Sequence, residues 1–403
     1  MGVNTNINLN QQEPAGGQSL SVIWIVVAGL GMIFGGILIA TITPSIFPQQ
    51  ASAEAVQVDN LFRFMLAVGG AIFLLVVGVL VFVIVRFRAR PGDLADGPPI
   101  HGNTTLEMVW TIIPAIIVLV LTVYSYQVWV SIRTLQPIHN SVAAVGQRFA
   151  WAFNYVITPE DLPASVTLDQ LEEPIRAAVT SEAGMNFSSA QLHTWVGQQM
   201  QVSLRTEDVN HAFWIPAMRI KQDLLAGRET SISFTPIEAG TYRIICAELC
   251  GSGHGNMAGT VGFNDDLQGA WLIVHPDEVT YLREFYEPEA AKVLFPPEDP
   301  ALRGRQILVG AAYPCATCHV LDDLGWVGNI GPNLNNIGVR AATRVSGLTA
   351  DQYLRNSIRH PGDYLVPGYS NLMPQFNAVA GEANYMPDTD LDAIVAYLLT
   401  QQQ

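Results

Sequence analysis

The chain has 403 residues, of which 49% are hydrophobic and only 14% are charged. That length allows two or three domains, and so apolar a composition is unusual for a purely water-soluble protein. From Ser131 to the end, 29 Asp and Glu residues outnumber 16 Lys and Arg residues. This acidic excess argues against binding to nucleic acid. It fits either a basic protein partner or a solvated surface that keeps the protein soluble.

The first predicted element is an apolar run, Ser21–Ile42, which is long enough to cross a lipid bilayer. The polar segment before it contains no Lys or Arg, and the run is long for a secretory signal. Ala51-Ser52-Ala53 nevertheless resembles the small-residue site at which such signals are cleaved. We expect residues 1–60 to hold either an extra transmembrane helix, the favoured alternative, or a cleaved signal.

Two further spans of membrane length are predicted at about 61–85 and 106–130, forming a transmembrane hairpin within residues 61–130. The connection between them carries Arg86, Arg88 and Arg90, and a short arginine-rich loop marks the cytoplasmic side of a membrane. Everything after the hairpin is therefore expected outside. A buried hairpin in a soluble protein is the alternative, but the length and the flanking charges of both spans argue against it.

Residues 131–276 have the composition of a soluble β-rich domain. Short alternating or β-branched runs are separated by turn residues, as a sandwich or barrel requires. These runs are Phe149–Ile157, Met200–Leu204, Thr230–Thr235, Tyr242–Ile245, Gly259–Phe263 and Ala270–Val274. Residues 159–198 interrupt the pattern and are interpreted as an insertion or surface loop. Residues 277–300 are rich in Glu and Pro and are interpreted as a linker containing a short helix-like piece.

The stretch from Cys246 to Met257 concentrates two thiols, an imidazole, a thioether and a carboxylate within twelve positions. Sulfur together with imidazole favours copper, zinc or an iron–sulfur cluster over hard cations. A structural zinc site needs four strong ligands, whereas an electron-transfer copper site tolerates a weak axial thioether. Copper is therefore favoured, and the alternative is a pair of inert buried cysteines. Folding could bring His211 beside this loop, although a lone histidine near aromatic residues is more often structural.

Residues 61–275 resemble subunit II of the haem–copper cytochrome c oxidases, whose extramembrane part is a cupredoxin β-sandwich that binds CuA. Three motifs carry this resemblance, and their combination is very specific. They are Cys246-x-Glu248-x-Cys250-Gly251-x-x-His254-x-x-Met257, Asp208-Val209-x-His211 and Glu107-x-x-Trp110-Thr111-x-x-Pro114.

The resemblance implies a ligand role for each matched residue of the copper motifs. Cys246 and Cys250 would bridge two copper ions through their thiolates. His211 would bind one copper and His254 the other, and Met257 would be a weak ligand to one of them. This arrangement would let both metals share one electron with little change in geometry.

Two glutamates receive further roles from the same resemblance. The backbone carbonyl of Glu248 would bind one copper, and its side chain would help to hold a magnesium ion shared with subunit I, since a carboxylate suits a hard cation. Glu107, at the cytoplasmic end of the third span, would lie at the entrance of a proton path into subunit I. An ionisable residue at a membrane helix is a functional candidate. The alternative is a charge that anchors the helix end.

One stretch departs from the family pattern. The family usually has Gly-His-x-Trp-x-Trp, whose first tryptophan receives electrons from soluble cytochrome c. Here the sequence is Gly146-Gln147-Arg148-Phe149-Ala150-Trp151, with Phe149 in the place of that tryptophan. The usual docking route is therefore in doubt, and a different donor geometry is expected.

Cys315-Ala-Thr-Cys318-His319 is a c-type haem attachment motif, in which two thiols bond the haem covalently and His319 becomes an axial ligand. A CxxC pair can also bind zinc or exchange disulfides, but the context favours haem. Gly331-Pro332-Asn333-Leu334 and a terminal Ala396-Tyr397-Leu398 are typical of class I cytochromes c, so residues 301–403 resemble a complete all-α cytochrome c domain.

Two methionines compete for the sixth position of this haem. Met373, followed by Pro374, matches the distal thioether of class I cytochromes c. Met386 lies almost at the start of the last predicted helix and is expected to cap it. Met373 is therefore the favoured axial ligand, and a His/Met pair would raise the haem potential.

The chain is thus expected to be multi-domain, with N-terminal transmembrane α-helices, a CuA cupredoxin β-sandwich and a C-terminal all-α class I cytochrome c. It resembles subunit II of a caa3-type oxidase. Electrons would pass from its own haem c to binuclear CuA and on to haem a and CuB in subunit I. That partner would reduce oxygen to water and pump protons, so no catalytic residue is expected in this chain.

The resemblance also implies partners and a location. Subunit I and subunit III are expected neighbours in the lipid bilayer. The donor to haem c would be a soluble or membrane cytochrome c, a small copper protein or a quinol-oxidising complex. The chain would be a multi-pass protein of a bacterial inner membrane, with its CuA and cytochrome c domains on the outer, periplasmic side.

Two alternative functions stay open at the level of sequence. The chain could be the electron-input subunit of a CuA-containing nitric oxide reductase, or a membrane-anchored electron carrier with no catalytic partner. A quinol oxidase subunit is disfavoured, because such subunits lack the copper ligands found here.

Overall fold

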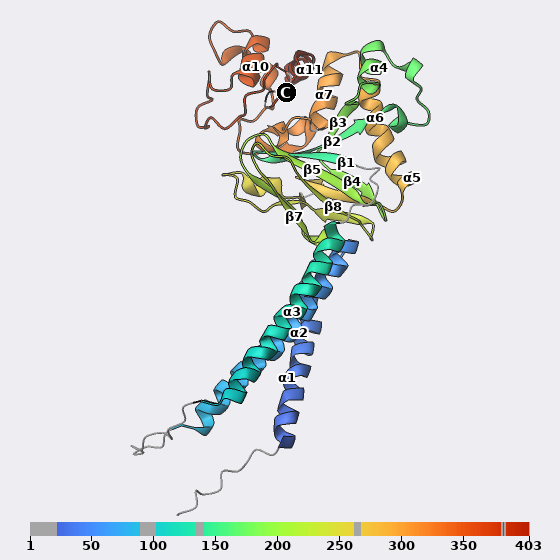
Figure 1. Ribbon diagram of the computed structural model, residues 1–403. Coiled ribbons are helices and arrows are strands. Elements are labelled where there is room, and N and C mark those ends of the chain that lie inside the picture. The colour runs from blue at the N-terminus through green and yellow to red at the C-terminus, as the bar shows by residue number, and fades with distance from the viewer. Residues whose placement is uncertain are drawn as a thin grey trace, which may run out of the picture. The chain divides into compact units, whose positions relative to one another are not determined.

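The computed structural model describes residues 22–88, 102–133, 141–261, 267–310, 312–379, 382 and 384–402. Long helices come first, and a β-rich part and a set of short helices follow them (Figure 1). The chain forms two compact units. One consists of most of the long helices, and the other contains Pro48–Val58 and Val128–Gln403. The residues of both predicted metal sites therefore belong to the same unit.

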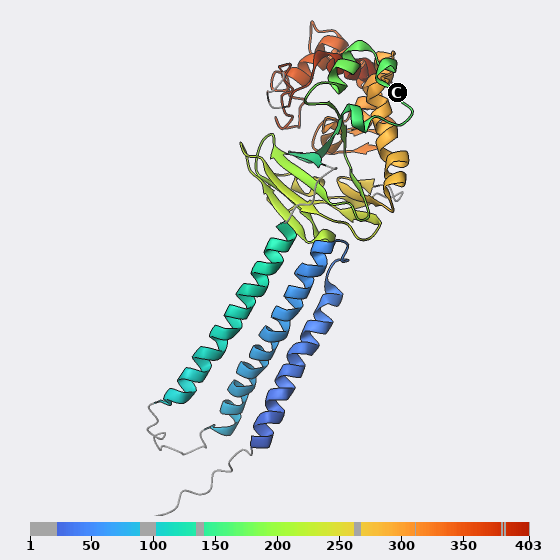
Figure 2. The ribbon, with the colours of Figure 1, turned by 45° about the vertical axis from the view of Figure 1, so that its right-hand side comes forward.

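Three long helices occupy the predicted membrane region (Figure 2). They are α1 (Val22–Ile42), α2 (Ala53–Arg86) and α3 (Thr104–Arg133). Val26–Ile46, α2 and α3 are each long and apolar enough to cross a membrane. Helix α2 begins well before the predicted span because the Ser52 hydroxyl accepts a hydrogen bond from the Ala55 N–H (2.9 Å) and caps it. Arg90, in the predicted cytoplasmic loop, lies outside the described residues.

The β-rich part contains a five-stranded sheet of order β3-β2-β1-β5-β8 and two three-stranded sheets of order β10-β6-β7 and β4-β13-β9. The strands are β1 (Ser141–Gln147), β2 (Ala150–Ile157), β3 (Met185–Ser189), β4 (Leu192–Trp195), β5 (Met200–Thr206), β6 (His211–Ile215), β7 (Ile220–Leu224), β8 (Thr230–Phe234), β9 (Gly240–Arg243), β10 (Ile245–Cys246) and β13 (Trp271–His275). A small pair, β11 (Thr260–Val261) and β12 (Leu267–Gln268), lies beside them.

One apolar core holds these sheets together. Burial alternates along β2, so every second side chain faces inward, as the period of a half-buried strand requires. Phe153, Phe213 and Phe234, from three different strands, are fully buried and belong to the same cluster. Burying such side chains stabilises the fold by roughly 1.5–3 kcal/mol each. This core supports the stretch Cys246–Met257, which is called the copper loop below.

The segment predicted as an insertion, 159–198, is partly sheet. Its first half contains short turns and the helix α4 (Glu173–Val179), but β3 pairs with β2, and β4 pairs with β13. These two strands are short, and β3 is rich in polar residues, so they lack the alternation by which strands are recognised. The part outside the sheets is therefore limited to about 158–184.

The segment predicted as a linker, 277–300, is mainly a folded helix. It runs through α5 (Glu278–Tyr281), a π-helical turn (Leu282–Tyr286) and α6 (Glu287–Leu294) along one side of the β-domain (Figure 1). Phe285 and Tyr286 pack on Phe187 of β3, and Leu294 is 1% exposed. The helix is thus part of the β-domain, and only a few residues separate it from the next domain.

The last part of the chain is helical around a second apolar core. Its helices are α7 (Pro300–Val309), α8 (Cys315–Cys318), α9 (Ile337–Arg340), α10 (Ala350–Arg359) and α11 (Asp388–Thr400). Helices α7 and α11 pack closely because Gly304 leaves room for the backbone of Ala393. The predicted fold class, with apolar N-terminal helices, a β-sandwich and a helical C-terminal domain, is confirmed.

Candidate metal centres

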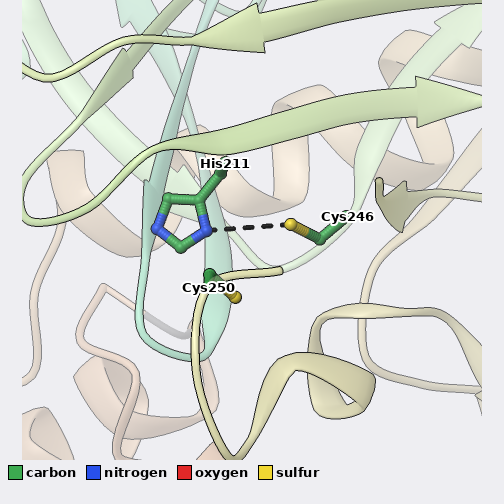
Figure 3. A group of neighbouring side chains, drawn as sticks. All are labelled: His211, Cys246 and Cys250. Carbon is green, nitrogen blue, oxygen red and sulfur yellow. Dashed lines mark hydrogen bonds between the residues drawn. The ribbon is translucent and has the colours of Figure 1, made fainter. Parts of the chain in front are cut away.

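The predicted copper site begins with three side chains that two strands and a loop bring together. His211 opens β6, Cys246 ends β10, and these strands pair so that Cys246 lies opposite Phe213. Cys250 follows in the loop. Ligand atoms of His211, Cys246 and Cys250 all lie within 4.8 Å of one another, and all three side chains are buried (Figure 3). The His211 Nδ1 is 3.8 Å from the Cys246 Sγ.

The other predicted ligands lie around the same sulfur atoms. The His254 Nδ1 is 3.4 Å and the Met257 Sδ is 3.5 Å from the Cys250 Sγ. The Glu248 carbonyl oxygen is 3.1 Å from the Cys246 Sγ. His254–Met257 forms a 3-10 turn that points both side chains back toward the cysteines. The structure thus brings together all six residues of the predicted copper motif.

The protonation of the two thiols shows why this cluster suits a cation. Burial raises the pKa of Cys246, but hydrogen bonds from His211 and from backbone groups outweigh it and lower that pKa. Burial and the neighbouring Cys246 charge raise the pKa of Cys250 to about 12. Two adjacent thiols cannot both ionise without a compensating positive charge. A bound copper supplies that charge, so the donor set fits the metal.

Asp208 fixes the orientation of His211. Its Oδ1 lies 2.9 Å from the His211 Nε2, and its Oδ2 accepts a hydrogen bond from the Arg148 N–H (2.8 Å). Burial would raise the pKa of Asp208, but the hydrogen bonds from His211 and Arg148 hold it well below its usual range. A charged carboxylate on Nε2 leaves Nδ1 facing the sulfur atoms, the usual arrangement of a metal-binding histidine.

The predicted haem residues lie around a cavity of the C-terminal domain. Cys315, His319 and Met373 line it, and its empty volume is about 970 Å³ when the solvent at its open mouth is included. Its other walls are mainly apolar, with Trp326, Tyr353, Leu354, Ile358 and Leu398 among them. An apolar cavity with a histidine, a thioether and an attachment thiol fits a haem.

The backbone that follows the haem motif holds His319 in place. The His319 Nδ1 donates a hydrogen bond to the Pro332 carbonyl (2.6 Å), which leaves Nε2 for the cavity side. A Cβ on Gly331 would lie 2.7 Å from the His319 Cε1, so only glycine permits this approach. Burial lowers the pKa of His319, which keeps the imidazole neutral, the form that binds a metal.

The two methionines occupy different environments. Met373 lines the cavity, whereas Met386 is 1% exposed within the core of the domain. The backbone of Met386 is bound on both sides: its N–H donates to the Asn377 carbonyl (2.8 Å), and its own carbonyl accepts from Arg359 (2.9 Å). The geometry therefore favours Met373 as the axial ligand.

Comparisons with known proteins agree with both sites. Family models match successive parts of the chain: the cytochrome c oxidase subunit II transmembrane domain at 40–128, its periplasmic domain at 140–262, and cytochrome c at 301–402. Cytochrome c oxidase subunit 2 of Synechocystis sp. is 36% identical over 233 residues, which cover 53% of this chain and 70% of that protein. The chain belongs to the cytochrome c oxidase subunit II family.

Two further relatives show how far the likeness extends. Cytochrome c oxidase subunit 2 of Thermostichus vulcanus is 35% identical over 239 residues, covering 53% of this chain and 72% of that protein. The protein of the same name from Alkalihalophilus pseudofirmus is 26% identical over 333 residues, which cover 81% of each chain. The longer match extends beyond the copper domain into the C-terminal part.

Membership of this family has direct consequences. The chain is a subunit of cytochrome c oxidase, an oxidoreductase, and associates with subunit I. Its copper domain and its cytochrome c domain imply that it carries copper and haem c. It is membrane-anchored with an extracellular domain. The nitric oxide reductase and the stand-alone carrier gain no support.

Three other residues singled out in the sequence lie in different environments. The Glu107 carboxylate, in the first turn of α3, accepts a hydrogen bond from the Asn103 N–H (3.2 Å), and the Asn103 side chain accepts one from the Leu106 N–H (3.1 Å). This reciprocal pair caps the helix. Phe149, which replaces the family tryptophan, is only 3% exposed. The Glu248 side chain, by contrast, is exposed.

Two residues near the copper ligands have roles that the sequence alone did not reveal. Asp208 was noticed as part of a motif but not as the partner of His211. The Trp151 indole N–H donates a hydrogen bond to the Met257 carbonyl (3.0 Å) and so fixes the end of the copper loop. The signal for Asp208 was its place three residues before the histidine.

Proposed function

We propose that this chain is the electron-input subunit of a caa3-type oxidase. When bound, haem c and a binuclear CuA centre supply one-electron redox chemistry, so electrons would pass from haem c to CuA and on to subunit I for oxygen reduction coupled to proton pumping. The observation that carries the proposal is the pairing, in one chain, of the His211–Cys246–Cys250 cluster with an apolar cavity lined by Cys315, His319 and Met373.

In the β-domain, the roles come from the family resemblance, and the proximity of the side chains supports them. Cys246 and Cys250 would hold the two copper ions through their thiolates, and His211 and His254 would each bind one of them. Met257 and the Glu248 carbonyl would be weaker ligands. Asp208 and Trp151 do not touch the metal but hold His211 and Met257 in position. Such supporting contacts typically change metal affinity 10- to 100-fold.

In the haem domain, Cys315 and Cys318 would attach the haem covalently, and His319 and Met373 would be its axial ligands. Met373→Leu should therefore lower the reduction potential of haem c and change its spectrum, because a thioether ligand raises the potential. Met386→Leu is the matched control, since it replaces a buried methionine of the same domain by a residue of similar volume. If Met386→Leu alone changed the spectrum, Met386 would be the axial ligand in place of Met373.

The membrane part should contain three retained spans. Ala51 and Ala53 donate backbone hydrogen bonds to the Ala217 and Thr235 carbonyls, and the Glu54 carboxylate accepts from the Thr235 N–H (2.8 Å). Cleavage at 51–53 would break this backbone pairing. Helix α1 also packs on α2, where Gly36 lies so close that a Cβ would be 2.8 Å from the Ala71 nitrogen. Intact-mass measurement of the purified subunit tests the retention of α1.

The remaining roles rest on the family resemblance and on accessible side chains. The exposed Glu248 carboxylate would help to bind a magnesium ion shared with subunit I, and Glu107 would admit protons at the inner end of α3. Subunit III is a further expected partner. A cytochrome c, a small copper protein or a quinol-oxidising complex would deliver electrons to haem c.

The copper assignment can be tested in the purified oxidase by its near-infrared absorption and metal content. His211→Ala should abolish the absorption of the copper pair and leave the haem c spectrum unchanged. His360→Ala, an exposed histidine outside both clusters, is the control and should retain both signals. An unchanged copper absorption in His211→Ala would disprove the ligand assignment.

A further inference from the structure

The copper loop touches the haem domain at Gly253. A Cβ built on Gly253 would lie 2.6 Å from the Cγ of Phe149 and 2.7 Å from the Cδ1 of Ile330. The space that a side chain would take at this position is therefore filled by two others, one from each domain. Ile330 belongs to the cytochrome c part of the chain, yet it packs against the core of the β-domain. Gly253 itself is buried.

On the copper side, this contact joins the ligand loop directly. Gly253 is the residue before His254 and lies three positions after Cys250. A Cβ on Gly251 would lie 3.1 Å from the Phe149 ring, so the ring packs against both Gly251 and Gly253. Glycine at these positions permits the close approach of an aromatic ring to the backbone.

On the haem side, the contact leads to the axial histidine. Ile330 precedes Gly331, whose N–H donates to the Cys318 carbonyl (2.7 Å). Pro332 follows, and its carbonyl accepts the His319 hydrogen bond. A short stretch of backbone therefore connects Ile330 to two residues of the haem motif. Phe149, Gly253 and Ile330 lie between the two candidate metal sites as one packed chain of atoms.

Two further contacts among the described residues join the haem domain to the β-domain. The Gln306 side chain donates to the Lys292 carbonyl (2.6 Å), which joins α7 to the end of α6, and Gly310 lies near the Ser188 carbonyl of β3. Domain interfaces of limited size within one chain are mobile by default. A buried apolar contact at Ile330 would therefore have a measurable effect on how long the domains stay docked.

We propose that Phe149, Gly253 and Ile330 form a docking seat, whose role is to position the haem domain on the copper loop for electron transfer within the chain. Its functional part rests on the proposed function: one electron leaves ferrous haem c, which becomes ferric, and reduces the oxidised copper pair. Tunnelling slows steeply with separation, so a packed contact favours this step. Phe149 stands where the family receives electrons from outside, and within the seat it is only 3% exposed, so an external donor would approach haem c instead.

Ile330→Ala in the assembled oxidase tests the seat, with two measurements. Hydrogen–deuterium exchange of residues 251–257 and 328–334 reports docking, and flash photoreduction of haem c reports the rate at which CuA is reduced. Removing a partly buried side chain should lower the ratio of docked to undocked domains about five-fold or more. Exchange in both segments should rise and the transfer rate should fall, with unchanged absorption of both metal centres. Val327→Ala, a nearby exposed residue, is the control and should change neither.

The outcomes separate the two proposals. If the wild-type oxidase transfers no electron from haem c to CuA, the proposed function fails, and the exchange measurement still tests the seat. If the wild type transfers electrons and Ile330→Ala matches Val327→Ala in both measurements, the seat is overturned. Phe149→Leu changes the seat from the β-domain side. If the seat exists, Phe149→Leu shows the same rise in exchange as Ile330→Ala. This second variant keeps the proposal falsifiable if Ile330→Ala fails to bind haem.

Discussion

In the β-domain, His211 and Cys246 lie on strands that pair directly, so the sheet register itself sets their separation. In the haem domain, His319 follows a helix of four residues and Met373 lies in an irregular segment between α10 and α11. The first site is a tight cluster whose members touch one another. The second is a cavity, partly open to solvent, that its two candidate axial ligands line from separate segments.

The two sites differ in how far the protein positions their ligands before the cofactor binds. Strand pairing, Asp208 and Trp151 fix the copper ligands whether or not metal is present, because each of these contacts is made within the protein. In the haem domain, the Pro332 carbonyl holds the His319 ring, but the other walls of the cavity are mainly apolar side chains, which lack packing partners on the side that faces the cavity. The copper domain is therefore expected to fold without copper, and the haem domain to depend on haem for its packing.

The largest difference between the two domains is expected when the cofactor of each is removed. The double variant Cys315→Ser/Cys318→Ser cannot attach haem covalently and leaves the cavity empty. We expect residues 301–403 to lose about 5 kcal/mol or more, on the order of the whole stability of a small domain. Chelation of copper should leave the strands of the β-domain protected. Hydrogen–deuterium exchange of the full-length subunit in the two states measures both effects.

The copper-depleted wild type is the control for the haem-free variant, because each retains the other cofactor. Loss of protection in β6 and β10 after copper removal, equal to the loss in α10 and α11 after haem removal, would show that neither site is preformed.

Asp208→Asn should give an intermediate effect confined to the copper site. The amide cannot supply the negative charge that orients His211, so copper affinity should fall roughly 10- to 100-fold while the fold is retained. Titration of the copper-free protein with copper measures this change. Glu207→Gln is the matched control, because its carboxylate pairs with the exposed Arg205 and not with the histidine. An unchanged affinity in Asp208→Asn would mean that the strands alone position the histidine.

The sequence pointed to the copper loop because its candidate ligands are close together in the chain. Cys246, Cys250, His254 and Met257 fall within one loop, so their spacing alone pointed to a soft metal. His211 needed the family resemblance, since only strand pairing brings it near. Asp208 was missed as a partner because its role depends on the direction of a side chain, and spacing carries no such information.

The composition of a segment was a poor guide to its structure where a few apolar residues lie among polar ones. The segment 277–300 is rich in Glu and Pro, and this average predicted a linker. Tyr281 and Phe285 nevertheless recur at helical spacing and bury themselves against the β-domain. Ile330 shows a different limit: nothing in the sequence distinguishes it from other loop isoleucines, because its contact with Gly253 exists only once both domains are folded.

The β-domain contains a pair of buried histidines. The His193 Nδ1 of β4 is 3.1 Å from the His275 Nε2 of β13, and the His193 ring stacks on Phe285. The His193 N–H donates to the Tyr155 hydroxyl (2.7 Å). Burial, with a smaller contribution from His275, lowers the pKa of His193 from 6.5 to about 3. Both rings belong to the β-domain, so they should make the stability of that domain sensitive to acid.

The smallest expected effect is the pH dependence that follows from this pair. Below pH 6.5 the unfolded chain binds a proton at His193 that the folded chain does not, so the free energy of unfolding of the β-domain should fall as the pH drops toward 3. The slope is at most about 1.4 kcal/mol per pH unit for one proton. His193→Gln should flatten this slope and His360→Gln, at an exposed site, should not. Denaturant unfolding of the full-length subunit between pH 4 and 7 measures the slope, and equal slopes in His193→Gln and wild type would show that the pair is not the source.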